Sequence, residues 1–234
     1  MIVSISQPAY MPWLGYFNRI AKSDMSIVLD NVMLERSSKT RFTNRNKIKT
    51  ERGWNWLTVP VKTAGLGQPL ICDVVLDMDQ NWQDKHRKSI FQSYNNSPHF
   101  EPHREWFEGF FSQKFTYLAP MLNDLTSHLL ETLNINTPML FSSKMGIKGE
   151  KSELILNLCK NVGATTYLSG PFGKDYLDAE AFEEAGINLD FDDYVHPTYS
   201  QIHGEFVPFM SIIDLLFNCG DDSLQILCGN NVAT

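Results

Sequence analysis

The sequence predicts an α/β fold, with a Rossmann-like, mostly parallel sheet flanked by helices and interrupted by a helical insertion. Three observations indicate this. Residues 1–32 have the pattern strand, short loop, helix and strand, which is a βαβ unit. Strand and helix patterns alternate again from residue 136 to residue 220, as they do in proteins with a parallel core. Between these parts, residues 80–135 have helical spacing broken by prolines. We therefore expect a single domain, residues 1–234, with its helical section at about 80–135.

The first βαβ unit follows from residue type and spacing. The stretch MIVSISQ is rich in β-branched residues and ends at Pro8, so it predicts a strand. The next stretch, PWLGYFNRIAKSD, has apolar residues at helical spacing, and we expect Leu14 and Phe17 to face the core. MSIVLDNV is apolar on both faces, as a parallel strand would be. WNWLTVPVK and LICDVVLD predict two further strands.

The second half continues the alternation. TPMLFSS, TTYLSG and INLDFDDYVHP predict strands, and DAEAFEEAG predicts a short helix. GEKSELILNLCKNVG predicts a helix that ends at Gly163. SIIDLLFNCG predicts a last helix with Ser211 as its N-cap.

Composition limits the classes of function. The chain is 43% hydrophobic and 20% charged, which is typical of a soluble globular protein. Its net charge of −7 argues against a polynucleotide partner. No apolar run reaches the roughly 18 residues that span a bilayer, and the start is unlike a signal peptide, so we expect a cytoplasmic chain. Four widely spaced cysteines with no CxxC pair argue against a metal site, and nothing identifies a cofactor.

The loop after the first strand, QPAYMPWLGYF, is a candidate wall of a ligand site. In such folds ligands bind beyond the carboxyl ends of the strands. Two prolines stiffen the loop and would hold Gln7, Tyr10, Trp13 and Tyr16 in place, while Gly15 permits a close approach. The free N–H groups of the helix start suit a phosphate. The alternative is that these rings pack the first helix on the sheet.

A basic segment follows the second strand. Seven basic residues and one acidic residue between Arg36 and Arg52 give a local charge of +6. Such an island in an acidic chain attracts anions, and arginine binds phosphate through paired hydrogen bonds. We expect Arg36, Arg41 and Arg45 to bind the phosphates of a small ligand. The alternative is a solvated loop.

Two later stretches carry further candidates. In YLSGPFGKDYL a strand runs into Ser169 and Gly170, and backbone amides near them, with Tyr176, would contact the ligand; the alternative is a plain strand-to-turn connection. In DDYVHPTYSQIHGEF, His196 lies close to Tyr199 and Gln201.

Histidines are the candidate acid/base residues. His196 ranks first because it stands near a strand end, and His86, on a helix, ranks second. Structural histidines with satisfied hydrogen bonds are the alternative in both cases.

Taken together, QPAYMPWLGYFNRIAKSD, VLDNV, NRNKIK, WLTVPV, YLSG, HPTYSQ and SIIDLLFNCG resemble the WbqC-like family over nearly the whole chain. Asp30 of VLDNV and Asn44 of NRNKIK join the substrate-binding candidates because they lie in these stretches. The resemblance implies bacterial O-antigen and other surface-polysaccharide clusters, and a transferase that adds glycine or a related acyl group to an amino sugar. Its partners would be a nucleotide-linked sugar and glycine or an activated aminoacyl donor.

A weaker resemblance is to the nucleotidyltransferase superfamily. Its HxGH motif falls on residues 13–16, where only Gly15 matches and both histidines are replaced by aromatic residues. This implies a similar fold and argues against adenylyl transfer. Two alternatives to the transferase stay open: an ATP-dependent adenylating ligase, and a non-catalytic binding subunit of the assembly machinery.

Overall fold

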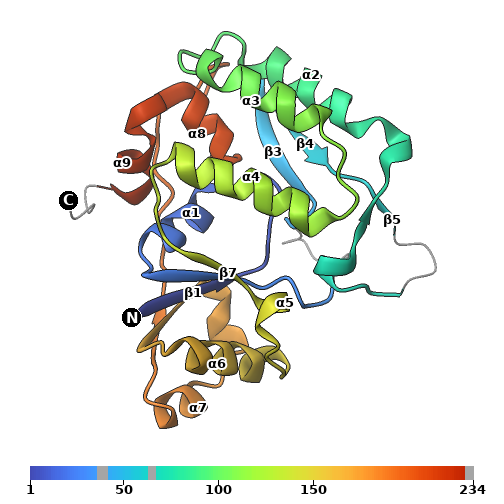
Figure 1. Cartoon of the computed structure of the whole chain (residues 1–234). Coiled ribbons are helices and arrows are strands. Elements are labelled where there is room, and N and C mark those ends of the chain that lie inside the picture. Colours follow the sequence, from blue (N-terminus) through green and yellow to red (C-terminus); the bar gives the residue numbers. More distant parts are fainter. Residues whose placement is uncertain (36–41, 63–66, 230–234) are drawn as a thin grey trace.

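A computed structural model describes residues 1–35, 42–62 and 67–229 (Figure 1). Its centre is a five-stranded sheet in which every neighbouring pair is parallel. The strands lie in the order β7 (Met139–Phe141), β2 (Met25–Val28), β1 (Ile2–Ser6), β8 (Thr166–Ser169) and β9 (Asn188–Phe191). The predicted α/β fold with a parallel sheet is confirmed.

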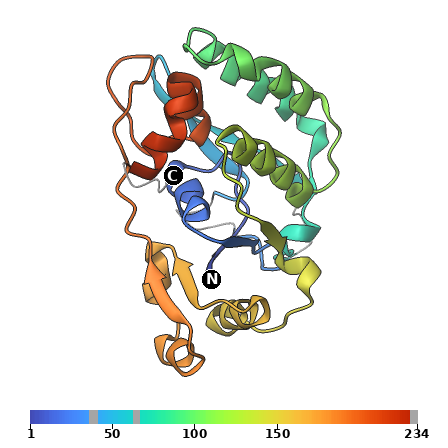
Figure 2. The ribbon, with the colours of Figure 1, turned by 60° about the vertical axis from the view of Figure 1, so that its left-hand side comes forward.

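Helices cover both faces of the sheet (Figures 1 and 2). One face carries α1 (Leu14–Ala21) and α4 (Leu118–Thr132), with α8 (Ile212–Cys219) packed in the same apolar core. The other face carries α6 (Lys151–Val162) and α7 (Ala179–Glu184), which pack on β1, β2 and β8 in a separate core. Leu14 and Phe17 are fully buried, as the helical spacing predicts.

The helical insertion is also confirmed. It consists of α2 (Trp82–Tyr94), α3 (Glu101–Ser112) and α4, which lie between β2 and β7 in the chain. The remaining elements are short: α5 (Ser142–Met145), α9 (Ser223–Cys228) and the 3₁₀ turns η1 (Ile71–Asp73), η2 (Met78–Gln80), η3 (Pro171–Asp175) and η4 (Gly220–Asp222).

Two predicted strands differ in the structure. The stretch WNWLTVPVK stays outside the main sheet: β4 (Gly53–Thr58) pairs antiparallel with β3 (Arg45–Thr50), so the second half of the basic segment is a strand and not a loop. LICDVVLD forms η1 and only a two-residue strand, β6 (Val75–Leu76), which pairs with β5 (Val61–Lys62). The apolar residues of these stretches pack against the helical insertion, so their periodicity reflects that core and not the central sheet.

The strand order reverses its direction beside β1. From β1 the chain proceeds to β2 and then β7 on one side, and β8 and β9 extend the sheet on the other side. In open parallel sheets, ligands bind at such a reversal, beyond the carboxyl ends of the two central strands. Here those ends are Ser6 of β1 and Ser169 of β8. The fold therefore places a binding crevice between the loops that follow these strands.

The burial of Phe17 leads to a stability prediction. Phe17 is 0% exposed in the core under α1, so Phe17→Ala should lower the free energy of unfolding by about 3–5 kcal/mol. The matched control is Phe172→Ala, because Phe172 is 66% exposed and its loss should change stability by less than about 0.5 kcal/mol. Urea unfolding of both variants measures the two values, and equal losses would contradict this description of the core.

Candidate functional site

A cavity of about 310 Å³ lies beside the reversal of strand order in the sheet. Three segments form it: the start of α1, the turn that follows β8, and the residues that follow β9. Its lining residues are Trp13, Gly15, Arg19, Pro171, Asp192, Asp193 and Tyr194. We call this cavity the crevice.

Arg19 supplies the positive charge of the crevice. It stands four residues after Gly15, so both lie on the same face of α1. One guanidinium nitrogen, Nη2, donates a hydrogen bond to Ser6 Oγ at 2.7 Å, whereas Nε is buried without a hydrogen-bond partner. Within the described residues, Arg19 forms no ion pair with a carboxylate. A partly buried cation without a counter-ion is costly, and a bound anion would remove that cost.

Gly170 fits closely against this guanidinium. A Cβ atom at position 170 would lie 2.6 Å from Nη1 of Arg19, so any side chain there would displace the arginine. Ser169, the last residue of β8, is buried, and its hydroxyl donates to the Gly170 carbonyl at 3.1 Å. The sequence-based choice of Ser169 and Gly170 therefore falls at the edge of the crevice. Tyr176 is 48% exposed, and its hydroxyl is close enough to Arg19 for the cation to lower its pKa, although burial raises that pKa more.

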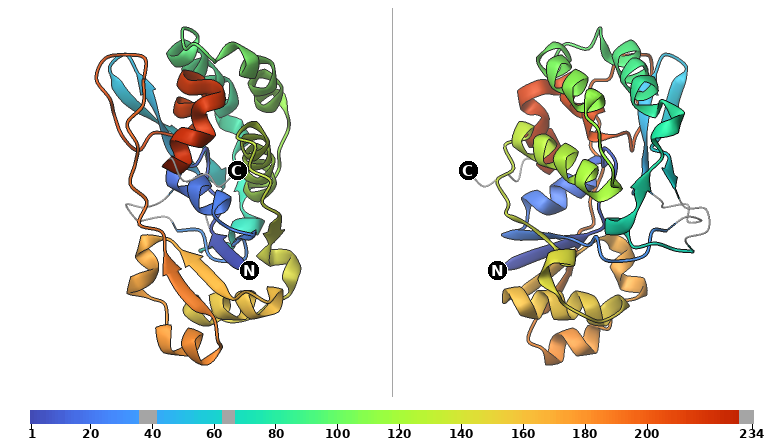
Figure 3. Two further views of the ribbon diagram at one scale, coloured as in Figure 1. Left: turned by 90° about the vertical axis from the view of Figure 1, so that its left-hand side faces the viewer. Right: turned by 45° about the vertical axis from the view of Figure 1, so that its right-hand side comes forward.

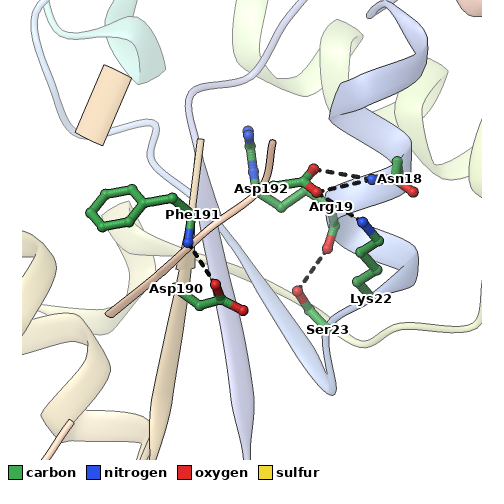
Figure 4. A network of polar contacts seen from close by, with 7 residues as sticks. All are labelled: Asn18, Arg19, Lys22, Ser23, Asp190, Phe191 and Asp192. Carbon is green, nitrogen blue, oxygen red and sulfur yellow. Dashed lines mark hydrogen bonds and ion pairs between the residues drawn. The ribbon is translucent and has the colours of Figure 1, made fainter. Parts of the chain in front are cut away.

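The Asp192 carboxylate is already neutralised. Asn18 Nδ2 donates to both of its oxygens, at 3.3 and 3.0 Å, and Lys22 Nζ donates to Oδ1 at 2.9 Å. Figure 4 shows Asn18 and Lys22 reaching this carboxylate from α1. Lys22 compensates Asp192, and Lys174 lies 3.6 Å from Asp193, the exposed second carboxylate of the crevice, so neither carboxylate is paired with Arg19.

Tyr194 adds a second unsatisfied donor. Its hydroxyl is buried without a hydrogen-bond partner, and burial raises its pKa, so the group stays protonated. Arg19 Nε and the Tyr194 hydroxyl are thus two buried donors without acceptors, in residues that line the crevice. Buried polar groups are normally hydrogen-bonded, but neither atom is exposed to the crevice, so each side chain would have to move before that donor could contact a ligand.

Trp13 forms an aromatic wall of the crevice. Its indole lies over Gly15, where a Cβ atom would come within 2.4 Å of the ring. Tyr194 and Phe209 pack edge-on against the same indole, with ring centroids at 5.6 and 5.9 Å. These contacts hold the indole in one orientation. Trp13 and Gly15 therefore line the crevice, and their contact with a ligand stays a prediction.

The other residues of the QPAYMPWLGYF loop do not line the crevice. Tyr10 is 0% exposed and its hydroxyl bonds His86 Nδ1 at 2.9 Å, so the expectation that it borders the pocket is corrected: it packs in the core. Tyr16 is also buried, against a separate narrow slot beside α4. Gln7 is exposed at the end of β1. Both interpretations of this loop hold in part: Tyr10 and Tyr16 pack in the core, whereas Trp13 lines the crevice.

Where it is described, the basic segment contributes no residue to the lining of the crevice, although its strand β3 lies beside the loop that carries Trp13: Asn46 Nδ2 donates to the Met11 carbonyl at 2.6 Å. Arg36 and Arg41 fall outside the described residues. Arg45 stacks its guanidinium 4.4 Å from the centre of the Trp56 ring, on the β3–β4 hairpin. Asn44 is buried and donates to the Val59 carbonyl at 2.8 Å. Its Oδ1 is buried without a hydrogen-bond partner, so a substrate contact by Asn44, like phosphate binding by the arginines, stays a prediction.

Asp30 fastens β2 to α5. Its carboxylate accepts hydrogen bonds from the Ser142 hydroxyl at 3.1 Å and from the backbone and hydroxyl of Ser143 at 2.8 and 2.7 Å. The side chain is buried and fully engaged, so the geometry does not support a substrate contact.

Tyr199 and Gln201 belong to a buried polar network around Asp214. The Tyr94 and Tyr199 hydroxyls donate to this carboxylate at 2.8 Å each, and Gln201 Nε2 donates at 2.6 Å. Lys49 Nζ donates to Gln201 Oε1 at 3.0 Å and to the Glu205 carbonyl. The network fastens the connecting segment, residues 192–210, which runs from β9 past the hairpin to α8 (Figure 3). Neither Tyr199 nor Gln201 lines the crevice, and their expected substrate contacts stay a prediction.

Neither candidate histidine has a free ring nitrogen that faces the crevice. His86 is buried among aromatic rings, and burial lowers its pKa to about 4. His196 Nδ1 donates to the Pro197 carbonyl at 2.8 Å, and its Nε2 accepts the Phe209 N–H at 3.1 Å. A general base needs a lone pair directed at the substrate. The catalytic role of both histidines stays a prediction that this geometry does not favour.

In the described part of the chain, no group of three or more His, Cys, Asp or Glu residues is arranged to hold a metal ion. In the same residues, no helix combines the length and apolar character needed to cross a bilayer. The four cysteines are free thiols, of which Cys159 is buried.

Sequence reasoning did not select Arg19, Asp192, Asp193 or Tyr194. A usable signal was present: Arg19 follows Gly15 by one helical turn, and DDY lies in the second half of the predicted strand INLDFDDYVHP, towards its carboxyl end. In a parallel sheet both positions point to the carboxyl edge, where ligands bind.

The environment of His86 predicts a pH dependence of stability. Its pKa is about 4 when folded and about 6.5 when unfolded, so between these values only the unfolded chain takes up the proton. Stability should therefore fall as pH drops below about 6.5, and by pH 5 this histidine should account for a loss of about 2 kcal/mol. Urea unfolding at pH 7.5 and pH 5 measures the loss, which should be smaller by that amount in His86→Gln. An identical loss in both proteins would show that His86 is protonated in the folded state.

Comparisons with known proteins agree with the sequence-based resemblance. No solved structure matches the chain significantly. The uncharacterized protein Rv1507c of Mycobacterium tuberculosis is 33% identical over 227 residues, which cover 96% of this chain and 96% of that protein. The model of the WbqC-like protein family matches residues 7–226. The match includes all seven residues that line the crevice. The chain belongs to the WbqC-like protein family.

Proposed function

We propose that the chain is a cytoplasmic transferase of bacterial surface-polysaccharide (O-antigen) precursor biosynthesis. It would add a glycyl or related acyl group to the amino group of a nucleotide-linked amino sugar bound in the crevice. The observation that carries the anionic part of this proposal is Arg19, a partly buried cation with no carboxylate partner among the described residues.

The crevice chemistry supports a phosphorylated ligand. A diphosphate supplies negative charge and several acceptor oxygens, which suit the guanidinium of Arg19, a lining residue without a carboxylate partner among the described residues. Trp13 offers a large fixed ring next to this guanidinium. The location at the strand reversal is where parallel α/β proteins bind nucleotides.

The reaction balances as an acyl transfer. The sugar nitrogen attacks the carbonyl carbon of an activated aminoacyl donor, a C–N bond forms, the bond to the donor's leaving group breaks, and the amine proton leaves to a base. The two alternatives predict other results. An adenylating ligase would consume ATP and release pyrophosphate, and a binding subunit would bind the sugar nucleotide without any product.

The crevice proposal is tested with Arg19→Gln. Loss of a charge-assisted contact to the diphosphate should weaken the binding of a nucleotide-linked amino sugar by about 1.5–3 kcal/mol in titration calorimetry. The control is Arg87→Gln, because Arg87 lies on α2 and bonds Asp84 instead. Product from wild-type protein, with either ATP and glycine or an activated glycyl donor, is followed by mass spectrometry.

A comparison with Arg45→Gln decides between the two basic regions. Undiminished binding by Arg19→Gln together with weak binding by Arg45→Gln would move the diphosphate from the crevice to the basic segment. Binding without product under every donor condition would leave only the binding-subunit alternative.

A further inference from the structure

Phe209 has two unusual features for an aromatic residue. Its backbone is in the left-handed region with φ at 60°, which is uncommon and strained for a bulky residue. Its side chain is 54% exposed. Packing in the core explains neither feature. The ring lies against Trp13, which lines the crevice. Residues held in strained conformations beside a cavity are typical of binding sites.

His196 holds Phe209 in this conformation. The Phe209 N–H donates to His196 Nε2 at 3.1 Å, and the two rings pack edge-on with centroids 5.0 Å apart. The other ring nitrogen, Nδ1, donates to the Pro197 carbonyl at 2.8 Å. This combination requires the neutral tautomer with hydrogen on Nδ1. Both nitrogens are therefore committed to the backbone of the connecting segment.

The result is a cluster of three aromatic rings, Trp13, Tyr194 and Phe209, next to the cation Arg19. Tyr194 and Phe209 meet Trp13 at interplanar angles of 69° and 62°, and Gly15 lies beneath the indole. Trp13 and Tyr194 line the same cavity as Arg19. A ligand held by its phosphates at Arg19 would bring an attached flat group against Trp13, and the exposed ring of Phe209, which packs on Trp13 outside the cavity lining, would extend that surface.

We propose that His196 is a positioning residue, which holds Phe209 beside Trp13 to complete a subsite for the nucleobase of the substrate. This inference rests on the proposed function, since it assumes that the diphosphate binds at Arg19. A nucleobase is favoured over a sugar because it is flat and apolar on both faces, and base–aromatic stacking tolerates any base. His196 acts through Phe209 and exchanges no proton with the substrate.

The subsite is tested by titration calorimetry with three probes: nucleoside diphosphates, inorganic pyrophosphate and an amino-sugar 1-phosphate. Phe209→Ala should weaken nucleoside diphosphate binding about tenfold or more, as loss of one stacked ring does, and leave pyrophosphate binding unchanged. Trp54→Ala is the matched control, because Trp54 is 47% exposed but lies on the hairpin, and it should change neither affinity.

His196 is tested by a pair of substitutions. The amide oxygen of His196→Gln can accept the Phe209 N–H in place of Nε2, whereas His196→Ala provides no acceptor. Binding should be weakened about tenfold in His196→Ala and largely retained in His196→Gln, and turnover by His196→Gln should stay within a few-fold of wild type. Equal loss of turnover in both variants, with unchanged nucleoside diphosphate affinity, would identify His196 as a proton-transfer residue and overturn the proposal.

The probes also separate this proposal from the crevice proposal. If Arg19→Gln weakens pyrophosphate binding but Phe209→Ala leaves nucleoside diphosphate affinity unchanged, the anion site stands and the nucleobase subsite is wrong. If Phe209→Ala weakens the binding of the amino-sugar 1-phosphate but not that of nucleoside diphosphates, the ring contacts the sugar and the proposed nucleobase subsite is wrong. If wild-type protein binds no nucleoside diphosphate, both proposals fail.

Discussion

Compensation of charge at the carboxyl edge of the sheet governs the candidate site. Two cations and one buried carboxylate meet there, and the hydrogen bonds assign the carboxylate of Asp192 to Lys22 and Asn18. Arg19 is left with a neutral hydroxyl as its partner. Leaving a cation partly buried without a counter-ion lowers stability, because desolvation is not offset by a Coulombic attraction. A site that binds anions needs such an arrangement, since a cation already paired would have to be released first.

The fold explains why this arrangement lies where it does. The chain leaves β1 toward β2 and adds β8 on the opposite side, so the loops after β1 and β8 diverge. Their divergence leaves room for the crevice. Because Gly170 has no side chain, the guanidinium of Arg19 can lie directly beside it at the edge of the crevice. The buried network around Asp214 fixes the connecting segment, which in turn supplies Tyr194 and Phe209 as neighbours of Trp13. Residues far from the crevice thus define its wall.

Local sequence patterns predicted the sheet, the helical insertion and part of the surroundings of the crevice. The parallel core followed from alternating elements, and the positions of Trp13, Gly15, Ser169 and Gly170 followed from the rule that ligands bind after strand ends. Tyr10 was assigned to the ligand site because it lies in a proline-stiffened loop after the first strand, but its hydroxyl bonds His86, which is 76 residues further along the chain. Such a long-range partner cannot be read from local spacing. Asp30 was taken as a ligand contact because it lies in a stretch that resembles the WbqC-like family, and its partners Ser142 and Ser143 are likewise distant in sequence.

The role of charge in the sequence was the hardest to predict. A run of basic residues drew attention to Arg45, whereas the isolated Arg19 gave no compositional signal. Burial and pairing decide which cation is available, and both depend on tertiary structure. Arg45 stacks on Trp56, while the Nε of Arg19 is buried and vacant.

The most direct test of the account is a crystal structure of the protein soaked with inorganic pyrophosphate. We expect the anion in the crevice, with one of its oxygens within hydrogen-bond distance of the Arg19 guanidinium. An anion bound at the hairpin cations Arg45 and Lys47, with the crevice beside Arg19 empty, would contradict the account.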